Sequence, residues 1–248
     1  SFTVQDGEIV GFLGPNGAGK STTMNMITGY LAPTGGTVAI DGHDVQEEPK
    51  EAKACIGYLP EIPPLYTDMT VQEYLLFVSE LKGKKKKADR VQDVAQAVQR
   101  AGLQEMEKRL IRNLSKGYRQ RVGIAAALLG SPKVIILDEP TAGQDFRHYT
   151  DIMEFLRGLN EQGVTVVMIT HDMHLMLEYT PRALVFCDGQ LIADRSAAAV
   201  LCDPELIEQA ALKETSLFTL ANRCGIAPAE DFVERFIHED REVRTHGC

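Results

Sequence analysis

Residues 14–21 read GPNGAGKS and fit the phosphate-binding loop pattern G-x-x-x-x-G-K-[ST] at every constrained position. An apolar run of strand length, residues 9–13, precedes them, and the proline-free residues 20–30 that follow have a helix-compatible pattern. The motif therefore lies between a predicted strand and a predicted helix, as its chemistry requires. The pattern indicates that the chain binds a nucleoside triphosphate. The simpler alternative is a glycine-rich turn that only connects the two elements.

The residue types within this loop suit a triphosphate and its metal ion. Backbone N–H groups and the positive end of the following helix meet the phosphate charge, and glycines at 14, 17 and 19 let the backbone approach closely. Lys20 can reach the β- and γ-phosphates, while the Ser21 hydroxyl can ligate Mg²⁺. We expect a nucleoside triphosphate and Mg²⁺ to be bound here, with nucleotide contacts from Gly14, Pro15, Asn16, Gly17, Ala18, Gly19, Lys20, Ser21 and Thr22.

Acidic and imidazole side chains follow two further apolar runs. Asp138 and Glu139 come directly after residues 134–137, and His171 follows residues 164–169 with Thr170 between. The carboxyl ends of strands in an open α/β sheet are where ligands bind. Asp138 suits Mg²⁺, Glu139 suits polarising a water for attack on the γ-phosphate, and His171 suits a γ-phosphate contact. A solvated strand end and a structural histidine are the alternatives.

Composition restricts the class of protein. The chain has 248 residues, 44% of them hydrophobic, which is enough for a substantial core. Since it has no apolar run of bilayer length and no charged-then-apolar leader, we expect a soluble, unexported chain. A net charge of −9 argues against nucleic-acid binding through overall positive charge, and five scattered cysteines fit reduced cytosolic thiols. The start at Ser1, so close to the loop, suggests a lost leading segment or a domain that begins late.

The order of apolar runs predicts an α/β fold, a phosphate-loop NTPase with a mainly parallel sheet, β-hairpins and an inserted helical subdomain. Strands are expected at 37–40, 55–59, 134–137 and 164–169, and a hairpin at 184–193. Helices are expected at 70–81, capped by Thr70, at 91–101, and from 196 to 220, before a frayed tail at 239–248. We expect a nucleotide-binding core at 1–66 and 131–195, a helical subdomain at 67–130 and a helical extension at 196–248.

A basic run, Lys82 and residues 83–87, lies between the two predicted helices of the middle segment. A solvated loop is one interpretation of such a run. The other is contact with anionic lipid head groups, since clustered lysines are attracted to a negatively charged membrane surface.

Four motifs in order give the chain a family resemblance. They are GPNGAGKST at 14–22, LSKGYRQR at 114–121, VIILDEPTAGQD at 134–145 and ITHD at 169–172. With these motifs the chain resembles the ATPase subunit of an ATP-binding cassette (ABC) transporter, from its start to about Arg195. The resemblance implies ATP hydrolysis that powers a separate membrane-spanning partner, and a place on the cytoplasmic face of the cell membrane.

The resemblance also implies roles for single residues. Cassettes of this family pack head to tail in pairs, so Ser115 and Gly117 would contact the γ-phosphate held by the loop of a second ATPase subunit. Glu139 matches the catalytic glutamate and His171 the switch histidine. Asp138 matches the magnesium-associated aspartate, and Asp145 the aspartate that acts across the dimer. No nucleic-acid partner is implied.

Three positions depart from the family pattern. Lys116 and Tyr118 replace the first glycine and the glutamine of the signature, and Glu61 stands where the family has a glutamine that senses magnesium and the membrane subunit. A carboxylate still binds metal through oxygen, so Glu61 remains a candidate ligand with Ser21 and Asp138. The region in which the family places an adenine-stacking aromatic, ahead of the phosphate loop, is absent from this sequence.

The two halves resemble different branches of the family. Residues 57–75, with Lys116, are similar to ATPases of multidrug or gliding-type exporters, whereas residues 141–155 and 170–179 are similar to those of energy-coupling-factor importers for vitamins and metal ions. Either the sequence is a hybrid joined within VIILDEP or one lineage carries both patterns. We expect exporter-type coupling, with the importer type as the alternative.

Two other classes of function remain open on the sequence. One is a nucleotide-binding module that hydrolyses poorly. The other is a soluble cassette ATPase of translation or DNA repair, which has less support because residues 61–115 show no sustained heptad pattern.

Overall fold

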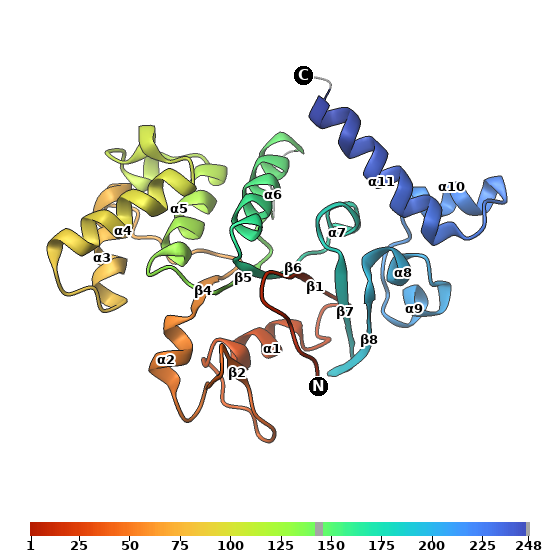
Figure 1. Ribbon diagram of the computed structural model, residues 1–248, viewed down its shortest axis with the longest axis horizontal. Coiled ribbons are helices and arrows are strands. Elements are labelled where there is room, and N and C mark those ends of the chain that lie inside the picture. Colours follow the sequence, from red (N-terminus) through yellow and green to blue (C-terminus); the bar gives the residue numbers. More distant parts are fainter. Residues whose placement is uncertain (142–145, 247–248) are drawn as a thin grey trace. The chain divides into compact units, whose positions relative to one another are not determined.

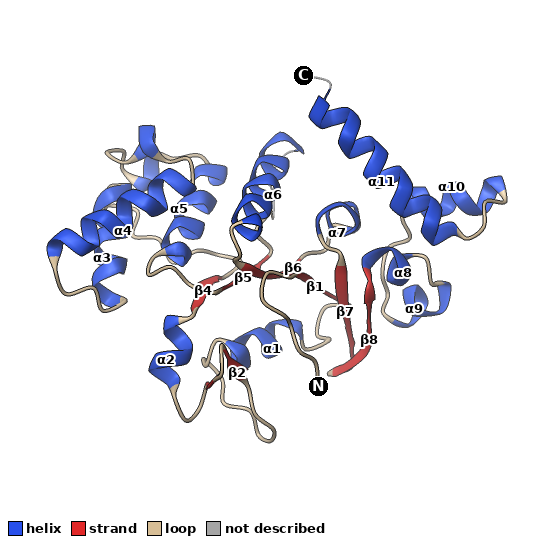
Figure 2. Cartoon of the chain, in the orientation of Figure 1, coloured by secondary structure: helices blue, strands red, loops and turns tan. Residues whose placement is uncertain are grey.

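The computed structural model describes residues 1–141 and 146–246, and the side chains of residues 146–148, 242 and 244–246 lie outside the description. Helices and strands alternate along most of the chain (Figure 1, Figure 2). The chain divides into two compact units, each described by itself here. The terminal unit consists of Ser1–Val4, Ile9–Lys20 and Met168–Cys248, and the central unit of Gln5–Glu8 and Ser21–Val167.

The strands of the central unit follow the order β4-β5-β6. Strand β4 (Ile56–Leu59) runs parallel to β5 (Val134–Asp138), and the register pairs Gly57 with Ile135. Strand β6 (Thr165–Ile169) contributes its residues 165–167 to this unit. The middle of β5 is fully buried, as expected of a strand in a parallel sheet covered on both faces. The strands predicted at 55–59, 134–137 and 164–169 are thus confirmed.

A second, two-stranded sheet in the central unit is antiparallel. It pairs β2 (Ala39–Ile40) with β3 (His43–Asp44). The sequence prediction of a strand over 37–40 was too long by two residues. Thr37 and Ala39 are exposed, so little apolar burial extends the pairing.

Helices make up most of the central unit, and α3, α4 and α5 gather into the predicted helical region (Figure 1). The helix bounds are α1 Lys20–Ile27, α2 Pro49–Ala54, α3 Val71–Leu81, α4 Lys87–Arg100, η1 Gln104–Met106, η2 Ile111–Asn113, α5 Lys116–Leu128 and α6 Phe146–Glu161. Thr70 caps α3 in a capping box, accepting from the Glu73 backbone N–H and donating its own backbone N–H to the Glu73 carboxylate. This confirms the predicted helix start.

Helix α1 is shorter than the proline-free sequence predicted. It ends at Ile27 rather than near residue 30. The Thr28 hydroxyl donates to the Met24 carbonyl at 3.0 Å, and Gly29 adopts a left-handed φ of 68°. Side-chain competition for the last carbonyls and a left-handed glycine are common ways to end a helix.

A polar network ties the end of α3 to α4 and to the end of α5. The hydroxyl of Ser79 donates to Asp93 Oδ2 at 2.8 Å, and the backbone N–H of Gly130 donates to Asp93 Oδ1 at 3.0 Å. Lys82 Nζ donates to the carbonyl oxygens of Ala127 at 3.0 Å and Leu129 at 2.8 Å. Burial of this ammonium lowers the pKa of Lys82 to about 8, with Asp93 opposing the shift. Because Ser79 and Asp93 are buried, the network fixes the arrangement of the three helices.

In the terminal unit the strand order is β6-β1-β7-β8, and β6 contributes residues 168–169. Strand β1 (Ile9–Leu13) runs parallel to β7 (Arg182–Cys187), and β7 is antiparallel to β8 (Gln190–Ser196). The predicted hairpin is confirmed. The helices are α7 Met173–Tyr179, α8 Ala197–Leu201, α9 Pro204–Gln209, α10 Ser216–Cys224 and α11 Ala229–His246. Their core packs around Leu13, Met176, Val185, Val200 and Leu201.

The tail of the chain is ordered further than the sequence suggested. We expected fraying over 239–248, but α11 continues to His246. Arg241 explains part of this, because its Nη1 donates to the Glu178 carbonyl at 3.1 Å and its guanidinium lies 4.9 Å from the centre of the Tyr179 ring. The contacted residues belong to α7, about sixty residues earlier in the chain, so no local sequence pattern could predict these contacts. Among the described residues, no helix is both long and apolar enough to cross a bilayer.

Candidate nucleotide-binding site

The phosphate loop in the terminal unit has a backbone that glycine alone adopts easily. Gly14, Gly17 and Gly19 have φ values of 135°, 82° and 98°. A Cβ atom on Gly14 would lie 2.0 Å from the Phe186 carbonyl oxygen, so the loop also packs tightly against β7. The backbone N–H of Gly189 donates to the Ala18 carbonyl at 3.1 Å, which links the loop to the β7–β8 turn. The hairpin thereby holds the loop in shape.

Lys20 lies at the centre of this loop. Its Nζ donates to the carbonyl oxygens of Gly14 at 2.7 Å and Pro15 at 2.9 Å, and the residue is only 6% exposed. Asn16 and Gly17, at the tip of the loop, are exposed. The ammonium charge is therefore enclosed by the loop, with left-handed backbone around it, in the arrangement expected of an anion-binding nest.

His171 also belongs to the terminal unit and is exposed. It follows the end of β6 after the buried Thr170, as predicted. The Thr170 hydroxyl accepts from the Asp172 backbone N–H at 3.1 Å, and Asp172 caps α7 by accepting from the backbone N–H groups of His174 and Leu175. Hydrogen bonds on both sides fix the backbone that carries the imidazole.

The two adjacent carboxylates lie in the central unit. Asp138 is the last residue of β5, and Glu139 follows it with a left-handed φ of 49°. This conformation is uncommon for a residue with a side chain, and such strain concentrates at functional sites. Burial, followed by the charge of Asp138, raises the pKa of Tyr58 on the neighbouring β4. Sequence reasoning placed both carboxylates correctly and missed the backbone strain.

The signature segment begins helix α5 in the central unit. Ser115 is exposed and caps the helix, its hydroxyl accepting from the Tyr118 backbone N–H at 3.4 Å. Gly117, in the first turn, is buried, whereas the atypical Lys116 is exposed. The exposed cap, the helix dipole and a lysine together make this end of α5 positive.

Glu61 is exposed in the loop after β4. This loop is held against α5, because a Cβ on Gly123 would lie 2.5 Å from Leu59 Cδ1 and 3.1 Å from Pro63 Cβ. The same helix therefore carries Ser115 at its start and supports the Glu61 loop at its middle.

The candidate metal ligands are a hydroxyl, Ser21, and two carboxylates, Asp138 and Glu61, all in the central unit. Oxygen donors suit Mg²⁺, which proteins usually hold through one or two carboxylates together with phosphate oxygens and waters. Within residues 1–141 and 146–246, no group of three His, Cys, Asp or Glu side chains could hold a metal ion by itself. The donor set thus fits a magnesium ion completed by a bound triphosphate.

The structure therefore distributes the predicted residues between the two units. Residues 14–20 and His171 belong to the terminal unit, in which Lys20 meets Gly14 and Pro15. Ser21, Thr22, Glu61, Ser115, Gly117, Asp138 and Glu139 belong to the central unit. Asp145 lies outside the described residues.

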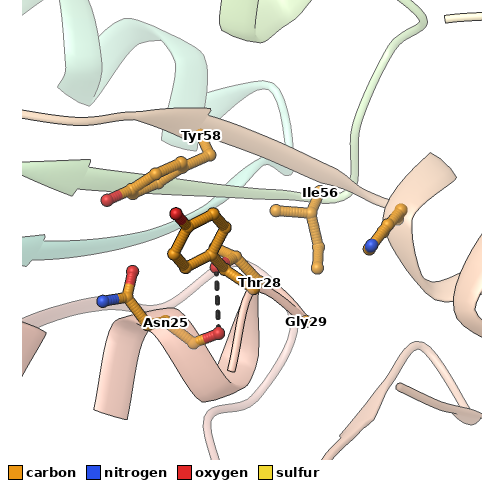
Figure 3. A pocket seen from close by; sticks show the side chains of 7 residues that line it. Asn25, Thr28, Gly29, Ile56 and Tyr58 are labelled. Atoms are coloured by element: carbon orange, nitrogen blue, oxygen red, sulfur yellow. Dashed lines mark hydrogen bonds between the residues drawn. The ribbon is translucent and has the colours of Figure 1, made fainter. Parts of the chain in front are cut away.

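Sequence reasoning missed one pocket of the central unit. It measures about 490 Å³ and is lined by Asn25, Thr28, Gly29, Tyr30, Lys53, Ile56 and Tyr58 (Figure 3). The pocket lies where α1 ends beside β4, and the Thr28 hydroxyl there donates to the Asn25 carbonyl at 3.3 Å. Tyr30, which lines this pocket, is 87% exposed.

Comparison with known proteins identifies relatives that share this chain's pattern. The ABC transporter family model matches residues 1–142. A protein of Enterococcus faecalis, named as an ABC transporter ATP-binding protein, is 44% identical over 98% of this chain, and a similarly named protein of Clostridium perfringens is 41% identical over 99%. These alignments run through both halves of the chain. The chain spans 43% of the length of each of these relatives.

Solved structures agree on the fold. The cbiO1 protein of Clostridium perfringens, described as part of the ABC transporter complex cbiONQ, matches 89% of this chain and 90% of its own, with a TM-score of 0.75 and 28% identity. A dimeric ATP-binding cassette bound to ADP and Pi matches 79% of this chain and 88% of its own, with a TM-score of 0.70 and 30% identity. This is the predicted phosphate-loop NTPase fold with a mostly parallel sheet. The chain therefore belongs to the ABC transporter family, as one of its ATP-binding cassettes.

Proposed function

We propose that this chain binds ATP with Mg²⁺ and hydrolyses it to ADP and phosphate, and that the cycle drives transport by a separate membrane-spanning partner. The observation that carries the proposal is the buried ammonium of Lys20, held within the loop at 2.7 Å from the Gly14 carbonyl oxygen. A buried lysine enclosed by left-handed glycines and followed by a helix suits phosphate, which supplies the negative charge the loop is built to meet.

The roles of the other residues follow from their chemistry. Loop N–H groups and Lys20 orient the phosphates and stabilise charge on the transferred group. Glu139 accepts a proton from the attacking water, and its strained backbone orients the carboxylate. His171 donates to the γ-phosphate. Mg²⁺, held by Ser21 and Asp138 with Glu61 as a further oxygen donor, neutralises phosphate charge when bound.

A second cassette completes the site in this proposal. Ser115 is exposed at a positive helix end, so a phosphate held by another cassette can reach it. The dimeric structure of a related cassette supports this pairing. The second cassette is either another copy of this chain or a related one, and Asp145 acts across the pair.

The decisive experiment replaces Glu139 with Gln in the assembled transporter. ATP turnover should fall by about 100-fold or more, because the general base is lost while the shape of the side chain is kept. ATP binding, followed by isothermal titration with Mg²⁺ present, should stay intact. Glu61→Gln is the matched control, since it removes a carboxylate that carries no proton in this scheme, and its turnover should fall less. Unchanged ATP turnover in Glu139→Gln would show that Glu139 is not the general base.

The same assay separates the proposal from a binding module that hydrolyses poorly. Tight ATP binding by the unmodified protein, with no turnover in the assembled complex, would favour that module. Loss of binding and turnover together would argue against both functions.

In this proposal the membrane partner binds at the pocket beside Tyr30, and the cassette works at the cytoplasmic face of the membrane. Several large apolar side chains of the central unit are exposed, among them Tyr30, Leu31 and Ile62. Tyr30→Arg should prevent co-purification with the membrane subunit and leave ATP binding unchanged. Retained assembly would place the partner elsewhere.

Two directions of transport are open to this cassette. Export is favoured by the resemblance of residues 57–75, which include the Glu61 loop and the start of α3. Import through an energy-coupling factor is the second candidate, favoured by the resemblance of residues 141–155 and 170–179. Identifying the membrane subunit that co-purifies with the cassette decides between them, since vitamin-uptake subunits would exclude the exporter.

A further inference from the structure

The turn between α3 and α4 carries the densest positive charge of the chain. Residues 80–91 hold five lysines and one arginine against two acidic residues, in a chain whose net charge is −9. Figure 1 shows α3 and α4 joined by this turn, in yellow. We name the surface formed by Leu81, Lys84, Lys85, Lys86, Lys87 and Val91 the basic tip.

The lysines of the basic tip are presented to solvent. Lys85, Lys86 and Lys87 are exposed and Lys84 is half-buried. Two neighbouring cations are already engaged, because Lys82 donates to carbonyls at the end of α5 and Arg90 forms an ion pair with Glu80. The structure thus distinguishes Lys82, whose ammonium group is held by carbonyl oxygens, from Lys85, Lys86 and Lys87, which are exposed.

Apolar side chains accompany this charge. Leu81 is 69% exposed and Val91 is 48% exposed. The Ser79–Asp93 hydrogen bond sets the register of the two antiparallel helices, and it brings Leu81 and Val91 to the same level near the turn. Both lie two residues from the buried pair, on the outward side of their helices. Exposed aliphatic groups beside a lysine cluster are the composition of surfaces that rest on lipid.

The positive charge of the basic tip is electrostatically unfavourable in the folded chain. Lys86 and Lys87 begin α4, where the positive end of the helix dipole disfavours cations, and Asp89 is the only acidic residue of the first turn. An anionic surface against the tip would relieve this repulsion.

We propose that the basic tip contacts the anionic head groups of a lipid bilayer. Lysines are point charges on long flexible stems, which suit a diffuse charged layer, and the stems can lie along apolar surface while the ammonium groups stay at the head groups. Leu81 and Val91 enter the boundary beneath them. An acidic protein segment would match the charge, but it offers no comparable layer for two isolated aliphatic side chains.

Vesicle co-sedimentation of the purified protein tests the proposal. The vesicles are pure phosphatidylcholine or equal parts of phosphatidylcholine and phosphatidylglycerol. Binding should require phosphatidylglycerol and should weaken as salt rises from about 0.05 to about 0.5 M, because the Debye length shortens. The assay uses no nucleotide, so its result is independent of ATP hydrolysis and of the proposed transport function.

Two matched variants locate the effect. Replacing Lys84, Lys85, Lys86 and Lys87 with Gln should weaken vesicle binding by about 100-fold or more. Each lysine close to an anionic surface adds a similar share of the binding free energy, so four losses multiply in the affinity. The control replaces four scattered exposed lysines, Lys50, Lys108, Lys133 and Lys213, with Gln, which changes the net charge equally and should leave most of the binding. Leu81→Ser should weaken binding a few-fold and leave its salt dependence unchanged.

Three results would overturn the proposal. The first is equal loss in the clustered and the scattered variants, which would make overall charge the cause. The second is equal binding to neutral vesicles. The third is binding to soluble polyglutamate with none to vesicles, which would identify an acidic protein segment as the partner.

Discussion

The ammonium nitrogen of Lys20 lies 2.7 Å from the carbonyl oxygen of Gly14, six residues earlier in the chain. The contact closes the phosphate loop on itself and places a buried cation at its centre. It links the first and the last constrained positions of the loop that the terminal unit contains, so the charge and the shape of the loop depend on each other.

Replacing Lys20 with Met should remove the charge and keep most of the side-chain length. ATP turnover should fall by about 100-fold or more, since a preorganised donor at the transferred group is lost. Turnover in the assembled transporter and ATP titration measure the effect. Lys50→Met, on the exposed face of α2, is the control and should behave like the unmodified protein. Normal ATP turnover in Lys20→Met would show that the Lys20 ammonium group is not needed for ATP hydrolysis.

Gly14 and Gly17 should tolerate alanine differently. At Gly14 a Cβ meets the Phe186 carbonyl oxygen at 2.0 Å, whereas at Gly17 nothing lies within 4 Å, although both have left-handed φ. Gly14→Ala should therefore lower the free energy of unfolding by about 3 kcal/mol or more, and Gly17→Ala by about 1 kcal/mol. Urea unfolding measures both. Equal losses would mean that backbone strain alone, and not the contact with β7, sets the requirement.

Asp93 should be a strong stability determinant of the helical region. Asp93→Ala leaves the Ser79 hydroxyl and the Gly130 N–H without their buried acceptor, so unfolding should become easier by about 2–4 kcal/mol. Ser79→Ala removes one bond and should cost about 1 kcal/mol. Chemical denaturation of both variants checks the ratio. If Asp93→Ala left the free energy of unfolding unchanged, the hydrogen bonds of Asp93 would not stabilise the helical region.

Because of Lys82, the free energy of unfolding should change with pH in the alkaline range. The folded pKa of Lys82, about 8, lies below the ordinary lysine pKa of 10.5, so between these values the unfolded chain binds more protons than the folded one. Stability from this group therefore rises as pH increases from about 8 towards 10.5, and it is fully lost once pH has fallen through 8. The neutral amine keeps two N–H groups, which suffice for the carbonyls of Ala127 and Leu129.

Comparison with Lys82→Gln isolates this effect. The difference in free energy of unfolding between the unmodified protein and Lys82→Gln should move in favour of the unmodified protein as pH rises across that window. Denaturant titrations at several pH values measure it. A difference that does not change with pH would show that the Lys82 ammonium is hydrated in the folded chain.

Local patterns predicted the elements whose causes are local. Thr70 and Glu73 predict the start of α3 because both partners of the capping box lie within one helical turn. The β7–β8 hairpin was similarly visible from its Asp188-Gly189 turn. Helix α11 was underestimated at its end because Arg241 contacts residues of α7, far away in sequence.

The candidate site shows the same division. The types and spacing of Gly14, Lys20, Asp138, Glu139 and His171 were sufficient to predict phosphate chemistry at strand ends. The comparisons confirmed that the chain is an ATP-binding cassette. The individual roles of these residues, and those of Ser115, Gly117 and Glu61, remain predictions. The strain at Glu139 and the pocket beside Tyr30 had no clear sequence signal, since backbone angles and hollows arise from the packing of whole elements.

The sequence by itself determined that this chain carries a phosphate loop, paired carboxylates after a strand and a lysine cluster, because these depend on residue type and short spacing. Only the tertiary structure decided which lysines hold other parts of the chain through their ammonium groups. Lys20 and Lys82 donate to carbonyl oxygens, whereas the side chains of Lys85, Lys86 and Lys87 extend into solvent. A charge acquires its role from what surrounds it, and the surroundings of Lys82 come from residues more than forty positions away.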